Sequence, residues 1–114
     1  MPEPGDVVTV DFPGATGVKR RPAVVVSSRI YHANRPDVIL GVITTQIAGA
    51  TTPLDYILQD WSAAGLRLPS AFRSYFATAL LSDVREIGRL FSSDWEEVQR
   101  RVALAVALPP MVTR

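Results

Sequence analysis

The first two-thirds of the chain follow the alternating pattern of β-strands. In Asp6–Phe12, the side chains of Val8, Val10 and Phe12 fall on one face and that of Thr9 falls on the other, which is typical of a half-buried strand. Further strands are predicted at residues 23–26, 38–47, 54–58 and 70–78, and a short segment ends at Leu90. The pattern therefore predicts a mainly β domain.

Two loops are expected between the first three strands. Residues 13–17 (PGATG) predict a flexible turn, and Lys19, Arg20 and Arg21 are expected at its end. Residues 27–36 are polar and contain Asn and Pro, which predicts a second loop.

Two glycines carry further local predictions. Gly41 lies inside the third strand, where a glycine indicates a bulge or a close approach of another group. Residues 60–65 predict one helical turn, with Asp60 at its N-cap and Gly65 just after its end.

The C-terminal part changes to a helical period. Ser93 and Glu96 have the spacing of a capping box, with Ser93 at the N-cap and Glu96 at the third helical position. Val98 and Val102 then recur at helical spacing, and Pro109 is expected to end the helix. One helix packed on about five to seven short strands predicts a small β-barrel with a C-terminal helix, as a single domain over residues 1–114.

Composition narrows the classes of function. The chain has 114 residues, no cysteine, one histidine and a formal net charge of +1. A disulfide scaffold, a thiolate zinc site, a cysteine nucleophile and a two-histidine ribonuclease site are therefore excluded. No acidic cluster with metal-ligand spacing lies among the candidate site residues that are named below, so no metal is expected.

The N-terminus carries acid where a signal peptide carries base, and it lacks an apolar core segment. The longest weakly polar stretch, residues 102–113, is too short to span a bilayer and contains two consecutive prolines. We expect a soluble cytoplasmic protein with no membrane contact.

Positive charge is concentrated locally. Residues 17–73 contain seven basic and three acidic side chains, although the whole chain is almost neutral. A local basic excess favours an RNA-binding surface on the loops and strands of this span.

Several motifs follow one another in a recognisable order. They are Gly5-Asp6-Val7-Val8 with Asp11-Phe12-Pro13, Arg21-Pro22-Ala23-Val24-Val25-Val26 with Ser27-Ser28, Val42-Ile43-Thr44-Thr45-Gln46-Ile47, Gly65-Leu66 with Pro69-Ser70, and Ile87-Gly88-Arg89-Leu90 before the helix. Together they resemble the MazF/PemK family of bacterial toxins over residues 5–108. Each motif alone is unspecific, and the ordered set carries the resemblance.

The resemblance implies an SH3-like barrel of the MazF/PemK/CcdB type and a homodimer. It also implies a sequence-specific endoribonuclease of single-stranded RNA that uses neither metal nor other cofactor. The implied products are a 2′,3′-cyclic phosphate and a 5′-hydroxyl, and the implied inhibitor is a cognate antitoxin protein. The family's catalytic arginine and phosphate-binding threonine correspond to Arg21 and Thr44.

These residue types suit the reaction, because RNA supplies its own 2′-hydroxyl nucleophile. A guanidinium matches two phosphoryl oxygens, and a threonine hydroxyl adds a neutral donor. Arginine does not deprotonate near neutral pH, so the base is left open between water, another side chain and His32.

Candidate RNA contacts are the side chains of Lys19, Arg20, Arg29 and Tyr31, since basic residues bind phosphate and an aromatic ring can stack on a base. The alternative is that the basic residues are solvated and that Tyr31 packs within its loop. The main alternative function is a non-catalytic barrel that binds a protein target, as the related CcdB toxins do. A plain SH3-like interaction module is a third possibility.

Overall fold

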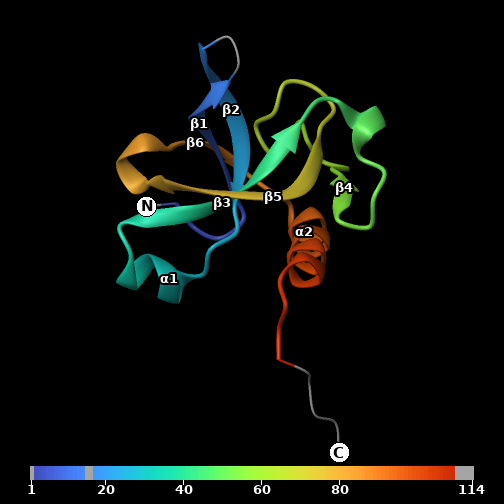
Figure 1. The fold of residues 1–114 in the computed structure, drawn as a ribbon. Helices are drawn as coiled ribbons and strands as arrows, with labels where there is room; N and C mark the ends of the chain where they lie inside the picture. The colour runs from blue at the N-terminus through green and yellow to red at the C-terminus, as the bar shows by residue number, and fades with distance from the viewer. Residues whose placement is uncertain (1, 15–16, 110–114) are drawn as a thin grey trace, which may run out of the picture.

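The chain folds around one six-stranded sheet with the strand order β4-β5-β3-β2-β1-β6 (Figure 1). The computed structural model describes residues 2–14 and 17–109. The strands are β1 (Asp6–Gly14), β2 (Gly17–Val25), β3 (Asp37–Thr44), β4 (Asp55–Ile57), β5 (Ala71–Leu80) and β6 (Arg85–Arg89). The helices are α1 (Arg29–Asn34) and α2 (Ser92–Ala105), with short 3₁₀ turns η1 (Ile47–Gly49) and η2 (Leu81–Asp83). Within the described ranges, no helix is long and apolar enough to cross a membrane.

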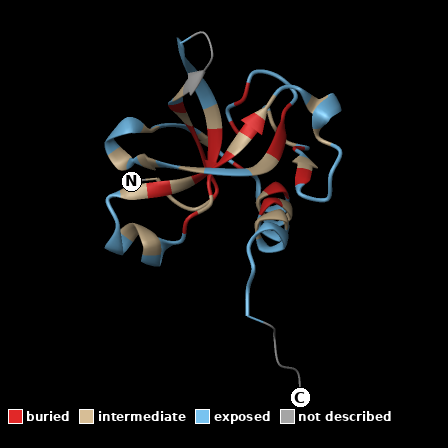
Figure 2. Cartoon of the chain, in the orientation of Figure 1, coloured by how far each residue is buried: buried red, intermediate tan, exposed pale blue. Residues whose placement is uncertain are grey.

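Hydrophobic side chains pack on both faces of the sheet. One core joins the sheet to α2 and the segment before β5; its buried members are Val7, Val24, Ile43, Leu58, Ala64, Leu66, Phe72, Leu90 and Val98. The other consists of Val8, Val10, Ala23, Val25, Val38 and Leu40, with Leu81 and Val84 packed against them. Figure 2 shows the buried residues gathered at the centre of the sheet and in α2. The predicted mainly β fold with a C-terminal helix is confirmed.

Gly41 allows β3 to pass directly under the ring of Phe72. A Cβ atom at position 41 would lie 2.3 Å from Cε1 of Phe72, so no other residue fits there without moving the ring. The register between β3 and β5 shifts at the same place, between Gly41 and Val42. The predicted bulge with a close approach is thus confirmed.

The predicted helical turn at residues 60–65, before β5, is also confirmed. The N–H of Ala64 donates to the carbonyl oxygen of Asp60 at 3.2 Å, and Gly65 has a positive φ of 90°. A Cβ atom on Gly65 would lie 2.2 Å from the carbonyl oxygen of Ile87, and one on Gly88 would lie 2.0 Å from that of Ala64. The two glycines therefore let this turn press against β6 backbone to backbone.

The hairpin of β1 and β2 is longer than the sequence predicts. The ladder continues to the pair of Gly14 and Gly17, which places Lys19, Arg20 and Arg21 on β2 rather than at the end of a loop. Cross-strand pairing outweighs the weak strand propensity of these basic residues. Residues 15 and 16 of the predicted turn lie outside the described residues.

The loop predicted at residues 27–36 is wrong, because it contains α1. The side-chain oxygen of Ser28 accepts a hydrogen bond from the N–H of Tyr31 at 3.2 Å and caps this helix. The third strand also ends earlier than predicted, at Thr44, and η1 follows it.

The capping box predicted for the C-terminal helix is wrong as well. Helix α2 has Phe91 at its N-cap, with no side-chain hydrogen bond there. Ser93 and Glu96 are both exposed. The carboxylate of the first turn that shapes the fold is Asp94, which is fully buried.

Asp94 joins three parts of the chain. Its Oδ1 accepts hydrogen bonds from Oη of Tyr56 at 2.7 Å and from the N–H of Gln59 at 3.2 Å, and its Oδ2 accepts one from the N–H of Asp60 at 2.9 Å. Burial, together with the hydrogen bond to Asp94, raises the pKa of Tyr56 well above its ordinary value. One carboxylate thus fixes α2 to β4 and to the segment that follows β4.

We expect Asp94→Ala to lower the free energy of unfolding by about 3 kcal/mol or more, because it leaves three donors without their acceptor. Urea unfolding followed by circular dichroism measures the change. The matched control is Glu96→Ala in the same turn, which should change stability by less than about 0.5 kcal/mol. Equal losses from the two substitutions would contradict this role of Asp94.

Candidate active site

Arg21 and Thr44 lie where two neighbouring strands separate. The ladder between β2 and β3 ends at the pair of Ala23 and Val42; beyond it, in the described residues, β2 pairs only with β1 and β3 only with β5. Figure 1 shows the two strands diverging from this point. We call the gap the β2–β3 opening.

The register determines how the two side chains face. Arg21 lies two residues before Ala23, and Thr44 lies two residues after Val42. Because the strands are antiparallel, both residues lie beyond the same end of the shared ladder. Because side chains alternate with a period of two, both project from the face of Ala23 and Val42, on either side of the opening. The register thus places the two predicted catalytic residues on one face of the sheet, on either side of the opening.

Both side chains are available for a ligand. Arg21 is exposed and Thr44 is half-buried. The hydroxyl oxygen of Thr44 accepts a hydrogen bond from the N–H of Gln46 at 3.1 Å, which leaves the hydroxyl proton free to donate. A guanidinium and a hydroxyl proton therefore border the same opening, as binding of two phosphoryl oxygens requires.

A second arginine follows on the same face. Arg73 is paired with Val42 across β3 and β5 and is one quarter exposed. Its Nε donates to Oδ1 of Asp55 at 3.1 Å, and its guanidinium lies 4.9 Å from the ring centre of Tyr75. Burial raises the pKa of Asp55, but hydrogen bonds from Thr52 and Arg73 outweigh it and hold the pKa below its usual value.

The predicted RNA contacts on β2 divide between the two faces of the sheet. By alternation, Lys19 projects from the same face as Arg21, and Arg20 from the other face. Both are exposed, and Arg20 forms only a long ion pair with Asp11, with 3.7 Å between Nε and Oδ1. Lys19 and Arg20 therefore remain close to the opening.

The other predicted contacts lie at the opposite end of β2, around α1. Nε of Arg29 lies 2.6 Å from Oε2 of Glu3. The hydroxyl of Tyr31 donates to Oδ2 of Asp37 at 2.9 Å. The structure does not bring Arg29 and Tyr31 together with the predicted catalytic pair.

His32 belongs to this distant group. Its Nε2 lies 2.6 Å from Oγ of Ser27, and that Oγ also accepts the N–H of Ile39 at 3.0 Å. Six residues of extended chain, about 20 Å, separate Ser27 from Arg21. The structure therefore does not bring His32 together with Arg21 of the same chain.

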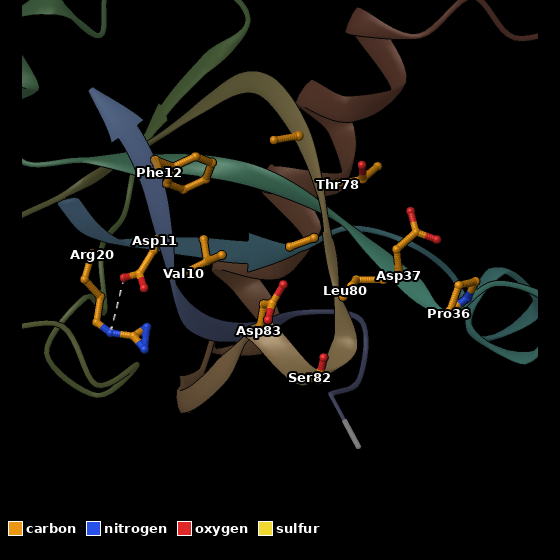
Figure 3. A pocket seen from close by; sticks show the side chains of 12 residues that line it. Val10, Asp11, Phe12, Arg20, Pro36, Asp37, Thr78, Leu80, Ser82 and Asp83 are labelled. Atoms are coloured by element: carbon orange, nitrogen blue, oxygen red, sulfur yellow. Dashed lines mark ion pairs between the residues drawn. The ribbon is translucent and has the colours of Figure 1, made fainter. Parts of the chain in front are cut away.

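A pocket of about 960 Å³ lies near the opening, but its acidic lining is unsuitable for RNA. Figure 3 shows Arg20 paired with Asp11 at one side of it and Asp37, Asp83 and Ser82 at the other. Its three carboxylates would repel a phosphodiester. In the part of the chain that the structure describes, no three His, Asp or Glu side chains are grouped so as to hold a metal ion.

Comparison with known families decides what the chain is related to. Residues 3–106 match the family of PemK-like, MazF-like toxins of type II toxin–antitoxin systems. The chain belongs to this family. The resemblance inferred from the ordered motifs is confirmed. No curated protein sequence matches the toxin significantly.

Solved structures share the fold of this toxin at low sequence identity. An endoribonuclease in complex with its cognate antitoxin from a mycobacterial species is 18% identical, with a TM-score of 0.72 over 96% of this chain and 100% of that one. MazF in the MazE–MazF complex of Deinococcus radiodurans is 19% identical, with a TM-score of 0.71 over 91% and 94%. The Mycobacterium tuberculosis toxin MazF-mt6 is 18% identical, with a TM-score of 0.68 over 88% and 94%.

Arg67 and Arg73 belong to the seven basic residues of the span 17–73, but the sequence alone assigns neither of them to the site. The alternation within Ser70–Thr78 places Arg73 with Ala71 on one face of the strand, so the pattern indicates on which face Arg73 lies. Arg67 lies outside any strand, in an irregular segment between Gly65 and Ser70, and no period predicts where it points.

Proposed function

We propose that this toxin is a sequence-specific endoribonuclease that cleaves single-stranded RNA, with mRNA as its substrate in the cytoplasm. The observation that carries the proposal is the placement of Arg21 and Thr44 on one sheet face beside the β2–β3 opening. Membership of the toxin family and a shared fold with an endoribonuclease support it.

In the proposed reaction the 2′-hydroxyl oxygen of the substrate forms a bond to phosphorus, and the bond from phosphorus to the 5′-oxygen breaks. The products are a 2′,3′-cyclic phosphate and a 5′-hydroxyl. Arg21 binds two phosphoryl oxygens and stabilises the charge of the phosphorane. The hydroxyl of Thr44 donates a hydrogen bond to the same phosphoryl group. Water takes the proton of the 2′-hydroxyl and supplies the proton that the leaving 5′-oxygen needs, because the Arg21 guanidinium stays charged and His32 of the same chain is remote.

We also propose that a cognate antitoxin neutralises the toxin. The support is the type II family assignment and the fold shared with a mycobacterial endoribonuclease solved in complex with its antitoxin. Co-expression with the antitoxin should restore the growth of cells that the toxin arrests.

We expect Arg21→Ala to lower the cleavage rate by about 10²–10³, as is typical when one donor to transition-state charge is lost. Arg21→Lys should lose nearly as much, because lysine keeps the charge but not the two-pronged geometry. Thr44→Val should lose less, since it removes a neutral donor and keeps the shape. Cleavage of a fluorescent oligoribonucleotide measures all three.

His32→Ala is the control for these variants and should change the rate only slightly. Wild-type cleavage by a folded Arg21→Ala protein would refute the site. A loss in His32→Ala equal to that in Arg21→Ala would show that His32 acts on the reaction despite its distance.

We expect cleavage to continue in EDTA and to produce 2′,3′-cyclic phosphate ends, because the proposed chemistry needs only the substrate's own hydroxyl and side chains of the protein. The ends are identified by their resistance to ligation and by mass spectrometry. Activity that disappears in EDTA and returns with magnesium would contradict the mechanism.

We further propose a homodimer, which would extend a short binding surface for single-stranded RNA. Exposed apolar side chains near the end of α2 and beyond it, Leu104, Val106 and Leu108, support an interface between copies. Light scattering at micromolar concentration should give twice the mass of the 12.4 kDa chain. A monomer mass would contradict the proposal.

A further inference from the structure

A second pocket lies on the other face of the β2–β3 opening. It has a volume of about 470 Å³ and lies between the ends of β2 and β3, the segment 65–70 and β6. The residues that matter most here are Arg20, Thr45, Leu66, Arg67, Leu68 and Ile87. We call it the Arg67 pocket.

The Arg67 pocket adjoins the proposed catalytic pair through consecutive residues. Arg20 precedes Arg21 on β2, and Thr45 follows Thr44 after β3. Because neighbouring residues of a strand project to opposite faces, the pair and the pocket are the two sides of one opening. The pocket therefore begins one residue away from the proposed catalytic pair on each strand, at the end where the two strands separate.

The charge of the Arg67 pocket suits a nucleotide. Two guanidiniums, of Arg20 and Arg67, line it without any carboxylate. Arg20 forms a long ion pair with Asp11, and the two side chains are 45% and 59% exposed, respectively. Such an exposed pair is weak, so Asp11 competes little with a ligand for Arg20. Arg67 is exposed and makes no ion pair among residues 2–14 and 17–109.

Other pockets of the described chain lack this combination. The pocket beside α1 contains Arg29 and Arg89, but each is bound within 2.7 Å to an acidic side chain. The pocket around Tyr75 contains Asp55 already paired with Arg73. In the Arg67 pocket, by contrast, Arg67 has no ion-pair partner among the described residues and Arg20 has only a long ion pair.

The walls of the pocket suit the flat faces of a base. Leu66, Leu68, Ile87 and Pro22 supply apolar surface, and hydroxyl-bearing side chains lie between them. The segment that carries Arg67 is held at both ends, because Gly65 packs against β6 and the Oγ of Ser70 donates to the carbonyl oxygen of Leu68 at 2.8 Å. A pocket fixed in this way can select a ligand by shape.

We propose that the Arg67 pocket receives the base of the nucleotide next to the scissile phosphate, and that Arg67 determines which base is accepted. A guanidinium only donates hydrogen bonds, so it favours a base whose outer edge carries a carbonyl oxygen rather than an amino group, which is guanine or uracil. This inference rests on the proposed RNA cleavage and assigns part of its sequence specificity.

The test is to sequence the fragments that the toxin produces from a randomised RNA library. Arg67→Ala should reduce the preference at one position beside the cut by about tenfold, within the range for loss of a side chain that reads a base edge. The product ends should stay the same. The matched control is Arg35→Ala, which removes an exposed arginine near α1 and should leave the cleavage motif unchanged. An unchanged motif in Arg67→Ala would overturn the inference.

Failure of the proposed function gives a different result. If the wild-type toxin cleaves no RNA, binding of four labelled oligoribonucleotides that differ at one position still tests the pocket. Selective binding of the guanine or uracil oligonucleotide, lost in Arg67→Ala, would support it. Equal binding of all four by the wild-type toxin would overturn it.

Discussion

The early end of the ladder between β2 and β3 is the constraint on which the site depends. Only three residue pairs join these strands, whereas eight join β3 to β5 and eight join β1 to β2. Strands held firmly by their other neighbours must separate once their shared ladder stops. The separation leaves an opening in the middle of a sheet, with Arg21 and Thr44 on one face and the Arg67 pocket on the other.

Packing elsewhere keeps this opening in shape. Phe72 fills the space that a side chain at Gly41 would need, which fixes the register of β3 against β5. Asp94 holds α2 to β4, so one face of the sheet is covered by the helix.

Much of the fold can be predicted from local pattern. The hydrophobic pattern locates β1 to β5, and helical spacing locates α2. Strand β6 has no buried residue, so the sequence indicates it only as a short segment that ends at Leu90. The motif order also gives the family and the positions of Arg21 and Thr44. Helix α1 is missed because it has only six residues, none of them buried, and its clearest signal is the cap at Ser28.

What the sequence did not predict depends on contacts between distant segments. Asp94 lies between the two residues of the predicted capping box and carries no signal of its own; only the approach of the segment after β4 shows that it is buried. His32 looks close to the basic residues along the chain, but the extended course of β2 separates it from Arg21. Whether Arg20 and Arg21 share a face depends on whether they lie in a loop or on a strand.

The central claim is that Arg21 and Thr44 act together on one phosphate. A double-mutant cycle tests it, with kcat/KM for RNA cleavage measured in Arg21→Ala, Thr44→Val and the combined variant. Two groups that bind the same phosphoryl group should be coupled, so the combined loss should be clearly smaller than the product of the single losses. Losses that multiply, as they do for independent and distant residues, would contradict the shared site.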